Sequence, residues 1–180
     1  ESYRGNVSCQ GPRACYDESK RVGETLCYIY HTTHGTNTNT IRPFNVFGPG
    51  MQETDYRVLP NFASRIKGGN PLNIYGSGYQ TRTFCYITDA MVGFLLVILR
   101  GVSGEAYNIG NSKPEISMID LVKKIEVISS KSVEYNIVEY PDSYPADEPN
   151  RRAPDIRKAR LQLDFIPQVG LDQGLKRFLD

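Results

Sequence analysis

The sequence lacks several features that particular classes of protein require. Its four cysteines form no C-x-x-C pair and its two histidines complete no zinc constellation with them, so we expect reduced thiols and no metal site. Charge of one sign is also lacking, because 21 Lys and Arg nearly balance 20 Asp and Glu. This balance predicts no broad electrostatic field for nucleic acid or an anionic membrane.

Long apolar runs are missing too. The longest apolar stretch, residues 94–99, is far too short to cross a bilayer, and residues 1–20 contain no signal-like apolar segment. For a chain with reduced thiols and no visible signal, the cytoplasm is the default expectation, although targeting signals upstream of residue 1 would not be visible.

A glycine-rich cradle for a dinucleotide is absent as well. Such a cradle needs a strand, a glycine-rich turn and a helix whose N-terminus receives the phosphates. Gly76-Ser77-Gly78 is the nearest candidate, but the pattern after it predicts a strand rather than a helix. We therefore interpret residues 76–78 as a hairpin turn.

What is present is an alternation of helical and strand patterns, which predicts an α/β fold. The patterns predict helices at about 14–34, 57–67, 89–100, 117–128, 155–163 and 171–179, and strands at about 38–44, 72–75, 83–87, 105–109 and 133–138. Asp89 precedes an apolar run, so we expect it to cap the helix there. Residues 141–154, with four prolines, are predicted to form a surface loop.

The strongest chemical pattern is Tyr16 followed by Lys20 near the start of the first helix. Residues four apart project from one face of a helix, so the two side chains are expected to lie together. A phenol loses its proton only at about pH 10, but an adjacent ammonium favours the phenolate. Tyr16 is therefore a candidate proton acceptor, and Lys20 is a candidate donor to the ribose of a dinucleotide.

The residues around this pair resemble a known family. The segment 11–21 (GPRACYDESKR) closely resembles the active-site helix of the extended short-chain dehydrogenase/reductase family, which includes the NAD-dependent epimerases and dehydratases. The resemblance continues in order through 42–49 (RPFNVFGP), 72–78 (LNIYGSG), 80–82 (QTR), 86–89 (YITD), 108–111 (NIGN) and 152–156 (RAPDI).

The resemblance implies a fold and a domain plan. Residues 1–50 would be the C-terminal portion of the NAD-binding Rossmann-like domain, with the active-site helix, the first part of that doubly wound domain lying outside the chain. Residues 51–180 would mainly form the smaller nucleotide-sugar-binding domain, with segments near 83–110 returning to the Rossmann-like domain. The full-length enzyme would be a homodimer, whereas the 180-residue chain alone would have no activity.

The resemblance also assigns roles to particular residues. Tyr16 would be the acid/base and would bind NAD together with Lys20. The nucleotide sugar would be bound by a group of residues that the family pattern places in the later segments: Asn45, Leu72, Tyr75, Arg82 and Arg152. Arg152 would also act in catalysis as a fixed positive charge beside the reacting sugar, because a guanidinium suits a diphosphate or a carboxylate.

The implied reaction is NAD-dependent modification of a nucleotide sugar. Within the family the sequence is most similar to decarboxylases that convert UDP-glucuronate to UDP-xylose through a 4-keto sugar. A 4,6-dehydratase or a 4-epimerase stays open, because the residues that assist Tyr16 and distinguish these enzymes would lie upstream. A further alternative is a non-catalytic truncated or binding fragment.

Overall fold

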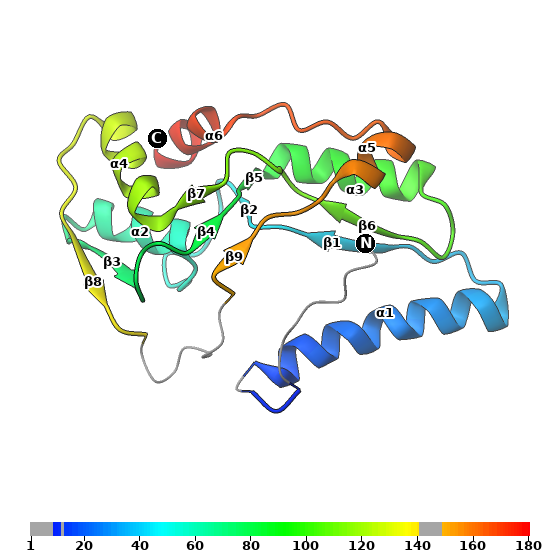
Figure 1. Ribbon diagram of the computed structural model, residues 1–180. Coiled ribbons are helices and arrows are strands. Elements are labelled where there is room, and N and C mark those ends of the chain that lie inside the picture. Colours follow the sequence, from blue (N-terminus) through cyan, green and yellow to red (C-terminus); the bar gives the residue numbers. More distant parts are fainter. Residues whose placement is uncertain (1–8, 12, 141–148) are drawn as a thin grey trace.

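The computed structural model describes residues 9–11, 13–140 and 149–180 (Figure 1). The helices are α1 (Ala14–His34), α2 (Val58–Lys67), α3 (Ile87–Arg100), α4 (Met118–Ser129), α5 (Arg157–Leu163) and α6 (Leu171–Leu179). The strands are β1 (Thr40–Pro43), β2 (Val46–Phe47), β3 (Leu72–Tyr75), β4 (Thr81–Arg82), β5 (Cys85–Tyr86), β6 (Ala106–Ile109), β7 (Ile116–Ser117), β8 (Tyr135–Val138) and β9 (Arg151–Arg152). All six predicted helices are present. Most of the loop predicted at 141–154 lies outside the described residues.

Local sequence accounts for the C-terminal end of α1 and the N-terminal end of α4. Gly35 ends α1 in the left-handed conformation at φ 65°, where its backbone N–H donates to the carbonyl oxygen of His31 and the next N–H, of Thr36, donates to that of Tyr30. Ser117 begins α4 as an N-cap whose hydroxyl accepts the backbone N–H of Asp120 at 3.1 Å. Capping residues of these types are visible in the sequence, so these helix boundaries were predicted within about two residues.

Parallel strand pairs dominate the sheets. β1 pairs with β6, β2 with β5 and β3 with β8, all in parallel, while β4 lies between antiparallel β7 and parallel β9. In Figure 1, α1 lies on one side of β1 and β6, and α3 and α5 lie on the other. Helices on both sides of parallel strands are typical of a doubly wound α/β fold, which confirms the predicted fold class.

Two hydrophobic clusters hold these elements together. The larger one joins α2, β3, α4 and α6, and its fully buried members include Phe62, Leu72, Leu121 and Leu175. The smaller one joins α3, β6 and α5 around Tyr107, whose ring is wholly buried. Burial of a large apolar side chain contributes roughly 1.5–3 kcal/mol, so both clusters are stabilising cores. The predicted domain boundaries at residues 50 and 51 stay a prediction.

Two local predictions were wrong. Residues 76–78 form no hairpin, because β3 pairs with β8 and β4 pairs with β7 and β9 rather than with each other. Asp89 does not cap α3, which begins at Ile87. It lies in the first turn, 6% exposed, and one carboxylate oxygen accepts the backbone N–H groups of Gln168 and Val169 at 3.1 and 2.8 Å. Both errors arise from partners far away in the chain.

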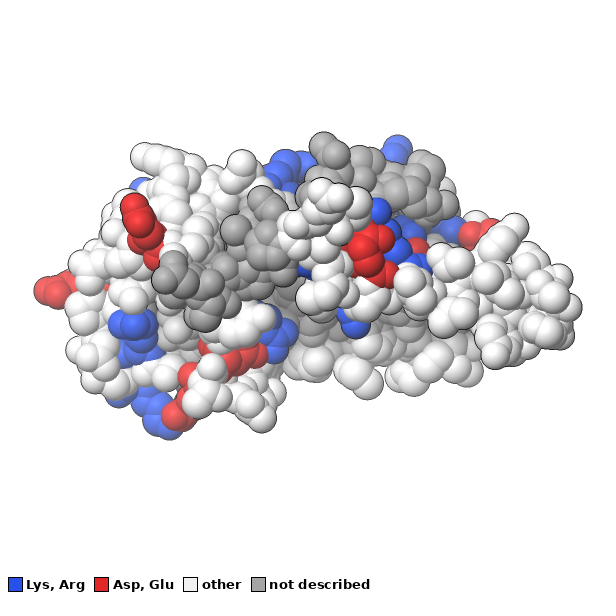
Figure 2. Space-filling view, turned by 90° about the horizontal axis from the view of Figure 1, so that it is seen from below, with Lys and Arg blue, Asp and Glu red and all other residues white. Residues whose placement is uncertain are grey.

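The first helix is unusually exposed. No residue of α1 is buried, and its exposed apolar side chains include Leu26, Tyr28 and Tyr30. Figure 2 shows the molecule from below, and its right-hand end, where the last turns of α1 lie in Figure 1, is almost entirely white. Residues 25–41 indeed contain no Lys, Arg, Asp or Glu. An uncharged surface that exposes large apolar side chains is typical of a contact surface between proteins or domains.

Membrane-spanning helices are not found in the part of the chain that the structure describes, since none of its helices combines the necessary length and apolarity.

Candidate functional site

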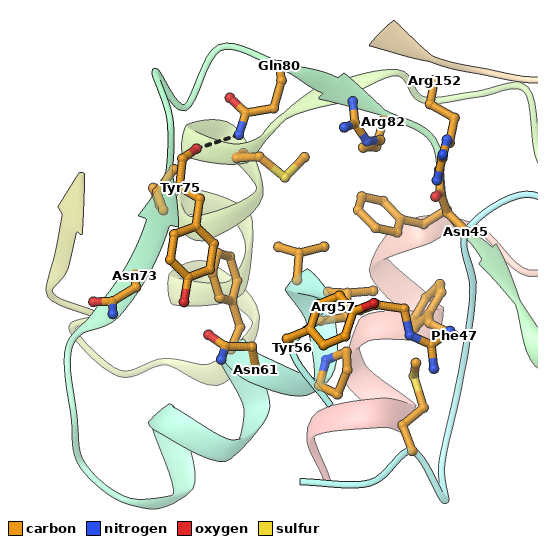
Figure 3. Close-up of a pocket in the computed structure, with 18 of the residues that line it drawn as sticks. Asn45, Phe47, Tyr56, Arg57, Asn61, Asn73, Tyr75, Gln80, Arg82 and Arg152 are labelled. Carbon is orange, nitrogen blue, oxygen red and sulfur yellow. Dashed lines mark hydrogen bonds between the residues drawn. The ribbon is translucent and has the colours of Figure 1, made fainter. Parts of the chain in front are cut away.

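One pocket collects four of the residues that the sequence singled out. Asn45, Tyr75, Arg82 and Arg152 all line it, on segments that lie up to about a hundred residues apart (Figure 3). The two arginines are neighbours because β4 and β9 run in parallel with Arg82 opposite Arg152. Side chains at matched positions of adjacent strands project to the same face of a sheet. The pairing therefore presents two guanidinium groups on one wall of the pocket.

Arg82 is the more deeply placed of the two arginines. It is 8% exposed, and one terminal nitrogen donates to the carbonyl oxygen of Thr81 at 2.8 Å. The planar fork of a guanidinium suits oxygen pairs such as those of a diphosphate. The wall formed by Arg82 and Arg152 is therefore suited to a polyanionic ligand.

Asn45 lies between β1 and β2, in a left-handed backbone conformation at φ 42°. Its side-chain amide donates to the carbonyl oxygen of Thr83 at 2.7 Å, and its backbone carbonyl accepts from Cys85 at 3.1 Å. Asparagine tolerates this conformation better than most residues, so the turn alone gives one reason for its presence. The second amide hydrogen of Asn45 is available to a ligand in the pocket.

The opposite wall of the pocket is aromatic. The rings of Tyr75 and Tyr140 stack with their centroids 5.7 Å apart and an angle of 24° between their planes. Gln80 supports this wall by donating to the carbonyl oxygen of Tyr75 at 2.7 Å, as Figure 3 shows. Flat aromatic surfaces bind planar rings by stacking, so this end of the pocket can hold a nucleobase.

Sequence reasoning missed several residues that line this pocket: Tyr56, Arg57, Asn61, Asn73, Gln80 and Tyr140. The side-chain oxygen of Asn61 is buried and has no hydrogen-bond partner among the described residues. Tyr140 enters the pocket only because β8, which it follows, pairs with β3. Nothing in its local sequence points to this pairing, whereas Gln80 stood inside a segment that the family resemblance had already marked.

Arg57 stands at the other side of the pocket, at the start of α2. Its guanidinium donates to Asp55 at 2.8 and 3.1 Å, and this hydrogen bond holds the pKa of the Asp55 carboxyl below its usual range. The same hydrogen bond is the main cause that raises the pKa of Arg57. Arg57 and Asp55 therefore form an ion pair at this side of the pocket.

Tyr16 and Lys20 lie side by side on α1, as their spacing predicted. The Lys20 ammonium lies 5.3 Å from the centroid of the Tyr16 ring, and the Arg13 guanidinium carbon lies 5.7 Å from it. Tyr16 is 56% exposed, and neither Tyr16 nor Lys20 is among the residues that line the pocket. The phenol and the ammonium thus form a separate exposed pair outside the pocket.

Leu72 is placed differently from the other candidates. Its side chain is fully buried in the larger core, and its backbone N–H donates to the carbonyl oxygen of Glu134 at 2.8 Å. The structure thus gives Leu72 a packing role, and a contact between its backbone and a ligand stays a prediction.

The exposed pair fits one end of a nicotinamide dinucleotide. A phenol hydroxyl and an ammonium group can both donate to ribose hydroxyls, and the phenol can exchange a proton with a bound alcohol. Within residues 9–11, 13–140 and 149–180, no glycine-rich turn leads from a strand directly into a helix. The chain's own residues therefore suit the nicotinamide ribose, and the pyrophosphate has no cradle among them.

Comparisons with known proteins agree with this geometry. The model of the "NAD dependent epimerase/dehydratase family" matches residues 1–110. UDP-glucuronic acid decarboxylase 1 of Xenopus tropicalis is 41% identical over 177 residues, covering 98% of this chain and 41% of that protein. UDP-glucuronic acid decarboxylase 5 of Arabidopsis thaliana is 41% identical over 175 residues, covering 97% of this chain and 50% of that protein. The chain therefore spans half or less of each of these two relatives.

Solved structures of similar proteins share the fold. UDP-glucuronic acid 4-epimerase from Bacillus cereus, in complex with UDP-glucuronic acid and NAD, superposes with a TM-score of 0.81 at 32% identity, covering 91% of this chain and 51% of the epimerase. dTDP-glucose 4,6-dehydratase from Streptomyces venezuelae, with NAD bound, has a TM-score of 0.80 at 25% identity, covering 91% of this chain and 49% of the dehydratase.

Proposed function

The chain belongs to the NAD-dependent epimerase/dehydratase family, and from that premise we propose that it is the substrate-binding part of an enzyme that decarboxylates UDP-glucuronate to UDP-xylose with NAD. The relatives at 41% identity are UDP-glucuronic acid decarboxylases, which favours this reaction over others in the family. The proposal concerns the full-length protein, of which this chain supplies the pocket and the Tyr16/Lys20 pair.

The observation that carries the proposal is the division of the pocket into an aromatic wall and an arginine wall. Tyr75 and Tyr140 offer a stacking surface, and Arg82 and Arg152 offer two cations in register across two strands. A uridine diphosphate has both complementary parts, namely a planar base and two phosphates. Such a ligand would extend its sugar beyond the phosphates.

The residues of the chain have defined tasks in this reaction. Tyr16, as its phenolate, would take the proton from the C4 hydroxyl group of the sugar, and the ammonium of Lys20 would stabilise that phenolate. NAD, when bound, would accept the C4 hydride and later return it. The resulting C4 ketone lies β to the carboxylate. The bond between C5 and C6 can therefore break, so that C6 leaves as carbon dioxide and the electron pair of that bond forms an enolate with the C4 carbonyl group. The Arg152 guanidinium would stabilise the negative charge on that enolate before C5 is protonated.

A second candidate reaction is 4-epimerisation or 4,6-dehydration. The solved structures that superpose on the chain include a UDP-glucuronic acid 4-epimerase and a dTDP-glucose 4,6-dehydratase. Gly50 and Ala153, which lie within and beside segments that resemble the family, carry no charge that could bind a sugar carboxylate, so a neutral hexose is an acceptable ligand. Both reactions would use the same Tyr16/Lys20 pair and the same uridine or thymidine diphosphate pocket.

The deciding experiment is mass spectrometry of products after the full-length protein that contains this chain is incubated with UDP-glucuronate and NAD. Release of carbon dioxide together with UDP-pentose supports the decarboxylase, and we expect Tyr16→Phe to abolish it. Tyr28→Phe is the matched control, because Tyr28 is an exposed tyrosine on the same helix. Formation of an isomeric UDP-hexuronate would support 4-epimerisation instead. Formation of a dehydrated product from a neutral nucleotide hexose would support 4,6-dehydration instead.

Failure of every nucleotide sugar to react would favour the remaining alternative, a binding protein without turnover. Formation of a homodimer and a cytoplasmic location stay predictions, as does inactivity of the isolated 180-residue chain. Size-exclusion chromatography of the full-length protein with light scattering tests the dimer directly.

A further inference from the structure

The charges of α1 are confined to its first half. They belong to Arg13, Asp17, Glu18, Lys20, Arg21 and Glu24, and no Lys, Arg, Asp or Glu follows until Arg42. On a helix surface, residues three or four apart are neighbours. Two carboxylates therefore stand at neighbour spacing from Lys20, namely Asp17 one turn before it and Glu24 one turn after it. Either could form an ion pair with the ammonium on which Tyr16 depends.

Arginines engage both of these carboxylates. Arg13 contacts Asp17 at 3.4 Å on α1 itself. Arg42 lies on β1 and binds Glu24 through two parallel contacts, of 2.7 Å from its Nε to Oε1 and 2.5 Å from its Nη2 to Oε2. Fork-to-fork pairing of this kind is the strong geometry for a guanidinium and a carboxylate.

Lys20, in contrast, has no carboxylate within ion-pair distance among the residues that the structure describes. Its ammonium instead lies over the Tyr16 ring. The other cations near Tyr16 are Arg13 at the start of the same helix and Arg57 at the start of α2, and each of these two arginines contacts an aspartate. The ammonium of Lys20 is thus the cation near Tyr16 that no described carboxylate offsets.

We propose that Arg42 is a positioning residue which, by occupying both carboxylate oxygens of Glu24, keeps the Lys20 ammonium available to Tyr16. This inference rests on the proposed function, because it assigns Tyr16 and Lys20 to the chemistry. Arg42 itself is not among the residues that line the pocket, so we assign it a positioning role and not a catalytic one. Its effect reaches the site through Glu24, and it depends on β1 lying against α1.

A simple tether between β1 and α1 would use the same ion pair, but the two roles predict different variants. If the pair is a tether, Arg42→Gln, Glu24→Gln and the double variant all break it and lose activity equally. If Arg42 keeps Glu24 from competing with Tyr16 for the Lys20 ammonium, only Arg42→Gln harms the site. That variant removes the guanidinium that holds both oxygens of Glu24, and it leaves a charged carboxylate four residues from Lys20 on the same helix. The double variant then recovers, since the competing carboxylate is gone.

The test measures kcat and KM of the full-length protein for its nucleotide sugar in these three variants. We expect Arg42→Gln to lower kcat about tenfold, the lower end of the effect that an opposite charge within about 4–6 Å has on an ionisation, with KM changed less than about twofold. Glu24→Gln and the double variant should keep kcat within about twofold of the wild type. Equal losses in all three variants, or an unchanged kcat in Arg42→Gln, would overturn the inference.

A matched control is Glu105→Gln. It breaks a comparable ion pair, between Glu105 and Lys158 at 2.6 Å, that joins α5 to the residue before β6. We expect it to leave kcat unchanged. If Arg42→Gln fails to fold, Glu24→Gln still decides, because the inference requires it to stay active and a tether requires it to fail.

A second readout needs no turnover. The fraction of Tyr16 present as phenolate at one fixed alkaline pH can be obtained from ultraviolet difference spectra between each protein and its Tyr16→Phe counterpart. We expect this fraction to fall in Arg42→Gln and to recover in the double variant, whereas an unchanged fraction contradicts the inference. If no nucleotide sugar reacts, the proposed function fails, and this measurement still tests the role of Arg42.

Discussion

Replacement of Arg82 by methionine gives the sharpest test of the pocket. Arg82 is 8% exposed in β4, and Arg152 stands opposite it in β9. Methionine fills a similar volume without charge or donors, so the change removes the fork of the guanidinium while preserving most of the packing. The experiment requires the full-length protein, and the ligand is UDP, which contains the base and the diphosphate but no sugar.

The magnitude follows from the bonds that would be lost. A hydrogen bond to a charged group contributes about 1.5–3 kcal/mol, and every 1.4 kcal/mol is a factor of about ten in affinity. Arg82→Met should therefore weaken UDP binding about 10-fold to 150-fold. Arg82→Lys should fall between the wild type and Arg82→Met, because an ammonium restores the charge but not the planar fork.

Isothermal titration calorimetry measures these affinities directly, and thermal unfolding of each variant shows whether the fold is intact. Arg100→Met is the matched control, since Arg100 is an exposed arginine whose contact with Asp164 is 3.5 Å long. We expect this control to bind UDP like the wild type. A folded Arg82→Met protein that binds UDP within about twofold of the wild type would refute the assignment of the arginine wall to the diphosphate.

Three further predictions concern stability and reactivity, each measured on the full-length protein. Asp89→Ala should lower the free energy of unfolding in urea by about 2–4 kcal/mol, because two backbone N–H groups lose their acceptor; a loss below about 0.5 kcal/mol would contradict this. Gly93→Ala should lower the free energy of unfolding by about 1–3 kcal/mol, since a Cβ there would lie 2.5 Å from a side-chain methyl group of β6. Gly23→Ala, in open space on α1, should instead raise the free energy of unfolding by about 0.5–1 kcal/mol. Equal effects at the two glycines would show that the close contact at Gly93 does not determine stability. Burial, with a smaller effect of the nearby carboxylate, raises the pKa of the Cys85 thiol from 9.0 to about 12. The thiol of the unfolded chain therefore ionises first, so stability should fall as pH rises above about 9, and mass spectrometry at pH 9 should find exposed Cys15 alkylated and Cys85 unmodified.

Sequence reasoning succeeded where the deciding interactions are local. The first helix was predicted with its observed ends because its apolar spacing and Gly35 lie within the helix and at its end. The alignment of Tyr16 with Lys20 followed from helical geometry alone. β3 was also predicted correctly, since an alternating run of four residues bounded by proline and glycine is typical of a strand.

Predictions failed where a distant partner decided the outcome. Asp89 is of a residue type that commonly caps helices, but its carboxylate instead accepts hydrogen bonds from the backbone N–H groups of residues 168 and 169. The turn at 76–78 has the glycines of a hairpin, yet each flanking strand finds a different partner. In both cases the local sequence is compatible with more than one tertiary arrangement, and the packing of distant segments selects one of them.

The sequence by itself determined the α/β class, the positions of the helices and, through the order of several short segments, the family. It also determined which residue types would serve the site, because helical spacing and family resemblance both act at short range along the chain. Only the tertiary structure decided that Tyr140 stacks on Tyr75, that Arg82 and Arg152 stand in register, and that Arg42 forms an ion pair with Glu24. The physical reason is that strand register and ion pairing join segments far apart in the chain, and their energies depend on how the whole molecule packs.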